Sequence, residues 1–229
     1  MLASLGLLYR KAGMTRPAFS QRYEKGHVPL VHELMGDDIA GYSRCYPVAD
    51  EADDVGFDAL TQMWHRTAAD AEATLERIAV PEARQRLTED EDQLFDRARL
   101  FFFMVDERGE APSFAIAEPL KLVCLSPALN GDRDAFIDRT EVEVVPLLTN
   151  LNPALLACRR NYVVPDSMFQ EDSRGQSQRR LPAFVTELWF ATAQDKARWL
   201  AAYSNAPEML RSAVGEPVEV QPFWSKKPV

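Results

Sequence analysis

A histidine and a tyrosine lie one helical turn apart in the first half of the chain. Phe19, Tyr23, His27 and Leu30 follow one another at i, i+4, i+8 and i+11, which places them on one face of a helix. The ordinary pKa of a histidine is about 6.5, so its side chain can accept or donate a proton near neutral pH. We therefore predict His27 as a general acid/base, with Tyr23 as its partner.

Three more aromatic residues are candidates for contact with a small ligand. Tyr9 and Tyr46 lie in predicted strands and would supply phenol donors, and Trp64 would form an apolar wall. A structural alternative stays open. In that alternative, His27 is a core histidine whose ring is hydrogen bonded to a backbone carbonyl.

The remaining histidines and the known motifs indicate no metal and no cofactor. His32 lies about 140° around the helix from His27, so we expect it at the surface. His65 follows Trp64 in a predicted strand, points to the opposite face, and is not expected to act in catalysis. The chain has no HxH or HExxH spacing, no glycine-rich phosphate loop and no GxSxG motif. We expect the acidic run 88–92 to be a solvated helix start or loop.

The composition favours a globular protein that acts on a small molecule. The apolar fraction is 46%, and the net charge of −9 is spread without a basic cluster, which argues against nucleic-acid or membrane-surface partners. No apolar stretch approaches the roughly 20 residues of a membrane span. Three separate cysteines without CxxC spacing, Cys45, Cys124 and Cys158, are typical of buried thiols in a reducing compartment. The sequence therefore predicts a cytoplasmic protein.

The periodicity of the first half predicts the elements that would position these residues. Apolar runs at 5–10, 40–48, 57–65 and 100–105 have the length of strands. Thr15 as N-cap and Pro17 in the first turn predict a helix that runs from about residue 16 to Gly36. A second helix is predicted from Thr67 to about Arg77. The order is β-α-β-β-α-β.

Three segments recur in the second half in the same order. Residues 5–19 resemble 120–136, residues 43–46 resemble 159–162, and residues 59–75 resemble 184–200. These repeats predict an α+β fold of two tandem ferredoxin-like domains, residues 1–110 and 119–229, packed sheet to sheet as an intramolecular dimeric α+β barrel. Residues 109–119 would be the linker. The polar insert 166–182 would be a surface loop or a lid.

A pattern in the first half carries a resemblance to a known family. It consists of Arg10, Gly13, Met14, Thr15, Phe19, Tyr23, His27, Pro29, Leu30 and Trp64. The chain resembles the EthD family, named for ethyl tert-butyl ether degradation, within the dimeric α+β barrel superfamily. The resemblance covers the first half and implies acid/base chemistry at the helix, since the family and its relatives include dehydratases, cyclases and cofactor-free oxygenases of aromatic or polyketide-like molecules.

The second half keeps the packing residues and loses the titratable ones. Val144 aligns with His27, and Thr140 aligns with Tyr23. A half without a proton-transferring residue fits a structural role. We therefore predict a single site, in the first half.

The predicted function is a cofactor-independent lyase or isomerase that acts on a small aromatic or polyketide-like molecule. Dehydration, cyclisation or a related proton transfer would use His27 as general acid/base. One alternative is a non-catalytic carrier or an accessory protein of an oxygenase pathway. Another is a haem-dependent oxygenase or peroxidase with His27 as proximal ligand. Assembly into a homodimer of such pseudo-dimers is compatible with the sequence.

Overall fold

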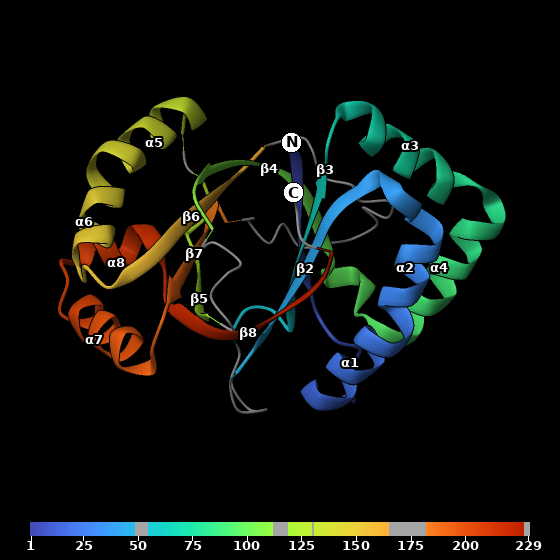
Figure 1. Cartoon of the computed structure of the whole chain (residues 1–229), viewed down its shortest axis with the longest axis horizontal. Coiled ribbons are helices and arrows are strands. Elements are labelled where there is room, and N and C mark those ends of the chain that lie inside the picture. Colours follow the sequence, from blue (N-terminus) through green and yellow to red (C-terminus); the bar gives the residue numbers. More distant parts are fainter. Residues whose placement is uncertain (49–54, 112–118, 130, 165–181, 227–229) are drawn as a thin grey trace. The chain divides into compact units, whose positions relative to one another are not determined.

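The computed structural model describes residues 1–48, 55–111, 119–129, 131–164 and 182–226 (Figure 1). Within these ranges the chain divides into two compact units. Unit 1 contains residues 1–105 and 222–226, and unit 2 contains residues 106–164 and 182–221, with the gaps just given. No described helix is both long and apolar enough to cross a membrane.

Unit 1 has the predicted helices and strands and one further helix. The N-cap Thr15 accepts a hydrogen bond from the Ala18 N–H, and Thr67 forms a capping box with Asp70, so both predicted helix starts are confirmed. The unpredicted helix is α4. The elements are β1 (Leu2–Leu8), α1 (Arg16–Arg22), a π turn (Tyr23–His27), α2 (Val28–Met35), a 3-10 turn (Gly36–Asp38), β2 (Ile39–Pro47), β3 (Ala59–His65), α3 (Ala68–Ala79), α4 (Pro81–Leu94), a 3-10 turn (Arg97–Arg99) and β4 (Phe101–Gly109).

Unit 2 repeats much of this order. Its first helix also contains a π turn, and it too ends in two helices and a strand. The elements are β5 (Leu120–Leu125), α5 (Arg133–Arg139), a π turn (Thr140–Val144), α6 (Val145–Asn150), β6 (Leu155–Val163), β7 (Phe184–Phe190), α7 (Ala193–Ser204), α8 (Glu208–Val214) and β8 (Pro217–Lys226).

The strands pair antiparallel in a matching pattern in the two units. Strand β1 lies between β3 and β4, and β2 pairs with the other side of β3. In unit 2, β5 lies between β7 and β8, and β6 pairs with β7. The hydrogen-bonded order is β1-β3-β2-β8-β5-β7-β6-β4, and it closes on itself.

The predicted pair of ferredoxin-like domains packed sheet to sheet is therefore wrong. The eight strands form one closed antiparallel barrel rather than two sheets stacked face to face. The physical reason lies in β4 and β8, which are nine and ten residues long and run through both units. Closure leaves no sheet edge with unpaired N–H and C=O groups. Residues 112–118 of the predicted linker and 166–181 of the predicted loop or lid lie outside the described residues.

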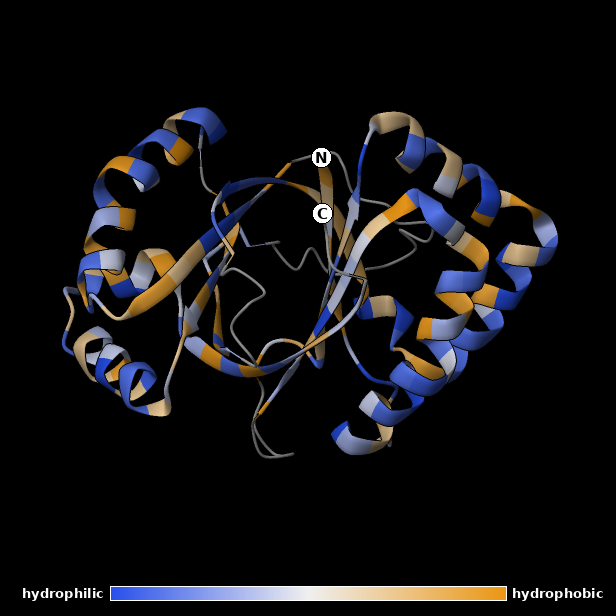
Figure 2. Cartoon of the chain, in the orientation of Figure 1, coloured by the Kyte–Doolittle hydropathy of each residue, from blue (hydrophilic) through white to orange (hydrophobic). Residues whose placement is uncertain are grey.

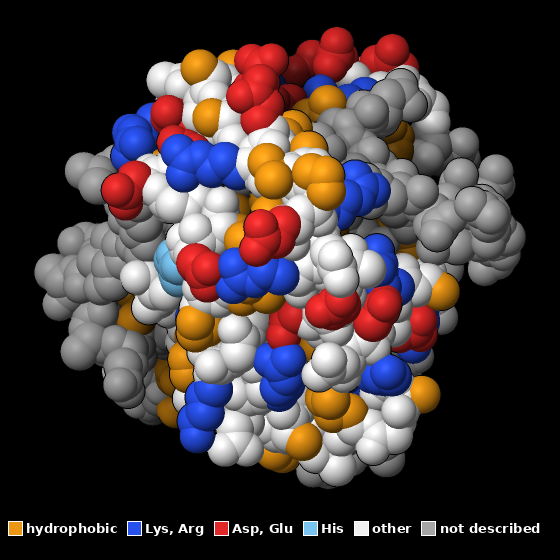
Figure 3. Space-filling model, turned by 90° about the vertical axis from the view of Figure 1, so that its right-hand side faces the viewer, with side chains coloured by type: hydrophobic (Ala, Val, Ile, Leu, Met, Phe, Trp, Pro, Cys, Tyr) orange, Lys and Arg blue, Asp and Glu red, His pale blue; other side chains and the backbone are white. Residues whose placement is uncertain are grey.

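The helices of each unit cover one face of its own strands. In unit 1 the buried cluster under the helices contains Phe19, Tyr23, Val31, Tyr42 and Phe95. Figure 2 shows that α4 is mostly hydrophilic, and only Leu94 of this helix is fully buried. Figure 3 shows acidic and basic side chains next to one another on the helical face of unit 1. This polar surface explains why α4 escaped prediction from apolar periodicity.

A π turn keeps the first long helix of unit 1 in register with its sheet. The buried residues Phe19, Tyr23, His27, Val31 and Met35 are spaced by four. In a regular α-helix, four residues rotate by about 400°, which is about 40° more than a full turn. Residues spaced by four would therefore drift around the helix and away from the sheet. The Val28 N–H bonds to the Tyr23 carbonyl, five residues back, and this wider turn corrects the drift.

Unit 2 buries a network of charges on the sheet face opposite its helices. Glu187 is fully buried, and its Oε1 accepts hydrogen bonds from Arg159 Nε and Asn161 Nδ2, each at 2.8 Å. Lys121 forms an ion pair with the same carboxylate. Burial by itself raises the pKa of Glu187, but the charges of Arg159 and Lys121 outweigh it and lower the pKa to about 2.

This network predicts a stability that depends on pH. The pKa of Glu187 is depressed, so its contribution is present above its ordinary value of 4.5 and is lost as the pH falls toward 2. Glu187→Gln should lower the free energy of unfolding by about 3 kcal/mol at pH 7 and by much less at pH 3. Urea unfolding at both pH values tests this. The exposed Glu143→Gln is the control, and equal losses for Glu187→Gln at the two pH values would contradict the linkage.

Candidate functional site

The candidate site is a hydrogen-bonded pair of His27 and Asp90. His27 comes from the π turn and Asp90 from α4, and Nδ1 lies 2.7 Å from Oδ2. Both side chains are largely buried, with 5% and 11% of their surface exposed. Burial raises the pKa of Asp90, but hydrogen bonds from His27 and Arg22 outweigh this effect and lower it. Asp90 is therefore an ionised carboxylate at neutral pH.

This contact assigns different roles to the two imidazole nitrogens. A carboxylate can only accept a hydrogen bond, so Nδ1 of His27 carries the proton and donates it to Asp90. Among the described residues, Nε2 of His27 has no hydrogen-bond partner in the protein. Nε2 is thus the basic nitrogen of the neutral imidazole.

A glycine in the helix makes room for a second partner of Asp90. The guanidinium of Arg22 forms an ion pair with Oδ1 of Asp90. It lies across Gly26, where a Cβ atom would stand 1.7 Å from Nη1 of Arg22. Glycine has a low helix propensity. Its missing side chain leaves space for Arg22, so that one oxygen of Asp90 contacts Arg22 and the other contacts His27.

Two aromatic rings enclose the imidazole. The ring centroid of Tyr23 lies 4.9 Å from that of His27, and Phe95 meets it edge to face at 5.2 Å. The Tyr23 hydroxyl, however, is hydrogen bonded to the Tyr42 hydroxyl at 2.8 Å. Burial raises the pKa of both phenols, so they stay neutral. The predicted partner of His27 therefore packs against the imidazole, whereas Asp90 orients it.

The predicted ligand contact Tyr46 belongs to an ion-pair cluster beside these rings. Arg44 of β2 donates two hydrogen bonds to the carboxylate of Glu24 in the π turn, Nε to Oε1 at 3.0 Å and Nη2 to Oε2 at 2.6 Å. The Tyr46 hydroxyl donates to Oε1 at 2.7 Å. Burial raises the pKa of Tyr46. The cluster fastens the π turn to the sheet three residues before His27.

Unit 2 contains the same cluster without a histidine. Arg160 donates to Glu141 from Nε at 3.1 Å and from Nη2 at 2.6 Å, and Tyr162 donates to Oε1 at 2.6 Å. Val144 is buried at the end of this π turn. The helix attachment is thus present in both units, whereas the His–Asp pair is found in unit 1.

The structure does not bring Tyr9 or Trp64 to His27. The Tyr9 hydroxyl donates to the Gly56 carbonyl, and the Arg99 guanidinium lies over the Tyr9 ring. Met63 packs under the helices, so the next residue, Trp64, points to the other face of the sheet, where it stacks on Trp224. Of the five predicted site residues, the structure therefore gathers His27, Tyr23 and Tyr46.

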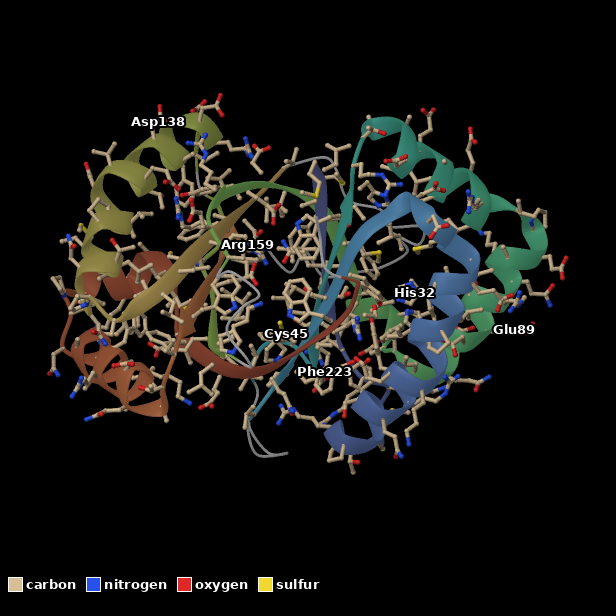
Figure 4. All side chains as sticks on the ribbon, in the orientation of Figure 1. His32, Cys45, Glu89, Asp138, Arg159 and Phe223 are labelled. Carbon is tan, nitrogen blue, oxygen red and sulfur yellow. The ribbon has the colours of Figure 1, made fainter. Side chains whose placement is uncertain are left out.

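The two other histidines have structural contacts. His32 was expected at the surface, but its Nε2 lies 2.7 Å from the Ser225 hydroxyl and its ring meets Tyr42 edge to face (Figure 4). The side chain nevertheless stays partly exposed, so the expected surface position is confirmed in part, and the two contacts connect α2 with strands β2 and β8. Nδ1 of His65 lies 3.2 Å from the carbonyl oxygen of Asp38, and burial lowers the pKa of His65.

Asp90 is the residue that sequence reasoning missed. The expectation of a solvated segment at 88–92 is wrong for this carboxylate, which is 11% exposed. A signal was present, since Pro81 can begin a helix and Leu87, Glu91 and Leu94 then follow at i, i+4 and i+7. The stripe is hard to recognise because a charged residue lies within it.

The pairing of Asp90 with His27 predicts one tautomer of the neutral imidazole. In the wild-type protein, the Nδ1–H form should dominate because the carboxylate accepts that proton. Asp90→Ala should give a mixture of the two tautomers, detected by ¹⁵N NMR of labelled histidine. Glu89 lies on the exposed side of the same helix (Figure 4), and Glu89→Ala should keep the wild-type signal. A wild-type tautomer of the Nε2–H form would refute the assignment.

Comparisons with known proteins agree with the fold. Residues 11–98 match the EthD domain. An anthrone oxidase-like protein is similar in structure, with a TM-score of 0.60, 12% identity and alignment over 100% of this chain and 94% of that one. A monooxygenase-like protein of Fusobacterium nucleatum has a TM-score of 0.57 at 8% identity, over 99% and 94% of the two chains. A comparison with curated protein sequences gives no match. The chain thus carries an EthD domain match on a fold shared with these proteins.

Proposed function

We propose that the chain is a cofactor-independent enzyme that removes a proton from a small aromatic or polyketide-like molecule. The observation that carries this proposal is the hydrogen bond from Nδ1 of His27 to the buried carboxylate of Asp90. The contact leaves Nε2 as the basic nitrogen. It also stabilises the imidazolium that forms when Nε2 accepts a proton, because the ionised Asp90 lies beside it.

The reaction type that we propose is a dehydration, a cyclisation or a related proton transfer. In a dehydration, Nε2 takes a proton from a carbon next to a carbonyl group, and the released electron pair forms a double bond as hydroxide leaves. The hydrogen and the hydroxyl leave together as water, so no electrons are exchanged with a cofactor. The aromatic rings of Tyr23 and Phe95 around the imidazole favour a flat, apolar substrate.

A second candidate begins with the same proton transfer. The two structural neighbours named above are anthrone oxidase-like and monooxygenase-like proteins. A carbanion generated by His27 could react with O₂, and a CH₂ group would then become a carbonyl group with release of one water. The two candidates share the base and differ in whether O₂ is consumed.

We place the reaction in unit 1 alone. Unit 2 has Val144 in its π turn, and an alkyl side chain cannot transfer a proton. Its closing helix α8 has seven residues, whereas α4 has fourteen and reaches the π turn with Asp90. These differences support a structural role for unit 2, and the matching π turns and ion-pair clusters support an origin of the units as tandem copies.

Replacing the proposed base should abolish most of the turnover. A suitable probe is 3-hydroxy-1-tetralone, whose loss of water gives the fluorescent product 1-naphthol. His27→Ala should lower kcat by about 10²- to 10⁴-fold, the usual contribution of a general base. His32→Ala, in which a histidine outside the pair is removed, should keep the wild-type value. Equal kcat for His27→Ala and the wild type would refute the proposed role.

Oxygen dependence separates the two candidates. For the lyase reaction, turnover of the same probe should be equal in air and under argon, because the products contain no new oxygen atom. An oxygen electrode should then record no uptake during the reaction. Turnover that stops under argon and consumes one O₂ per substrate would instead assign the oxygenase reaction.

A further inference from the structure

A second carboxyl group lies in the middle of the buried face of α4. At about 100° per residue, Leu94, Leu87, Glu91 and Phe95 follow Asp90 within an arc of about 140° around the helix. The two residues at the ends of this arc contact the imidazole, Asp90 through Nδ1 at 2.7 Å and Phe95 edge to face at 5.2 Å. Glu91 is thus held between two contacts of His27.

The surroundings of Glu91 compensate a negative charge on it only in part. Its side chain is 16% exposed, and the nearest cation, Nη2 of Arg97, lies 3.9 Å away. Among the described residues it accepts no side-chain hydrogen bond. Burial raises the pKa of Glu91, and the charges of Asp90 and Asp92 add to this, whereas those of His27 and Arg97 oppose it. The two adjacent carboxyl groups therefore differ in pKa, which is raised for Glu91 and lowered for Asp90.

The long ion pair with Arg97 is the one structural contact among the described residues that favours an acid at this position. The neighbours of Glu91 along the stripe, Leu87 and Leu94, are apolar, and a buried carboxyl without hydrogen bonds costs free energy. Groups that a fold keeps against its own stability are typical of functional sites. A pair of titratable groups whose environments separate their protonation states is also the pattern of acid/base catalysis.

We propose that Glu91 is the general acid of this site and works opposite His27. The inference rests on the proposed function and extends it, because a dehydration needs a donor for the leaving group as well as a base. Substrates would then carry a hydroxyl group on the carbon next to the one that loses its proton, as in a β-hydroxy ketone.

The step balances without any further reactant. Nε2 of His27 takes the carbon-bound proton, the C–H electron pair becomes the second bond of C=C, and the C–O bond breaks. The departing oxygen takes the proton of the Glu91 carboxyl group and leaves as water. His27 is then protonated and Glu91 ionised, and transfer of one proton from His27 to Glu91 restores both groups.

The first test replaces the acid by its neutral isostere. Glu91→Gln keeps the shape of the side chain and removes the transferable proton, so kcat for 3-hydroxy-1-tetralone should fall by about 10²- to 10⁴-fold. The decline of kcat at high pH, which reports loss of the acid, should disappear. The melting temperature should stay equal or rise, because an amide replaces a buried acid. Glu89→Gln, on the exposed side of α4, should keep wild-type kcat.

The second test needs no substrate. In ¹³C NMR of the side-chain carboxyl groups, Glu91 should titrate above the ordinary range of a glutamate, and His27→Ala should shift the titrations of both Glu91 and Asp90 to higher pH. Titration of Glu91 in the ordinary range of a glutamate, or wild-type kcat in Glu91→Gln, would overturn the proposal. If His27→Ala loses activity and Glu91→Gln does not, only this inference fails. If neither variant loses activity, the proposed function fails as well.

Discussion

One backbone hydrogen bond sets the geometry of unit 1, the bond from the Val28 N–H to the Tyr23 carbonyl. It widens a single helical turn, so that residues spaced by four stay on one face and the helix keeps contact with the sheet over its whole length. Without this turn, either Phe19 or Met35 would leave the core. The same turn directs His27 toward α4, where Asp90 lies. Packing and the candidate chemistry thus depend on one local irregularity.

Local signals predicted every strand and all helices of unit 1 except α4, whereas long-range contacts were missed. Thr15, Pro17 and the spacing of Phe19, Tyr23 and His27 predicted the helix and its buried face, because capping and periodicity act within a few residues. Asp90 was missed since its helix is polar and meets His27 across 63 positions of the sequence. Closure of the barrel was missed because edge pairing has no local signature. The orientation of Trp64 depends on strand parity, which the sequence left open.

The two units handle buried charge in different ways. In unit 2, Glu187 is surrounded by Arg159, Lys121 and Asn161, so the carboxylate is held in its ionised form. A charge that is fully compensated stabilises one arrangement and exchanges protons with difficulty. In unit 1, Asp90 is compensated in the same way and Glu91 is not. The proposed acid/base chemistry of unit 1 rests on this difference between neighbouring carboxyl groups.

The clusters Glu24–Arg44–Tyr46 and Glu141–Arg160–Tyr162 have nearly the same hydrogen-bond lengths. Each fastens its helix through residues that take no part in the His27–Asp90 contact. The attachment of each helix to its sheet therefore does not depend on the side chain at position 27 or 144. Both positions are buried, so an exchange there is limited to residues that fill the same space, and within that limit one unit carries a histidine and the other a valine on the same frame.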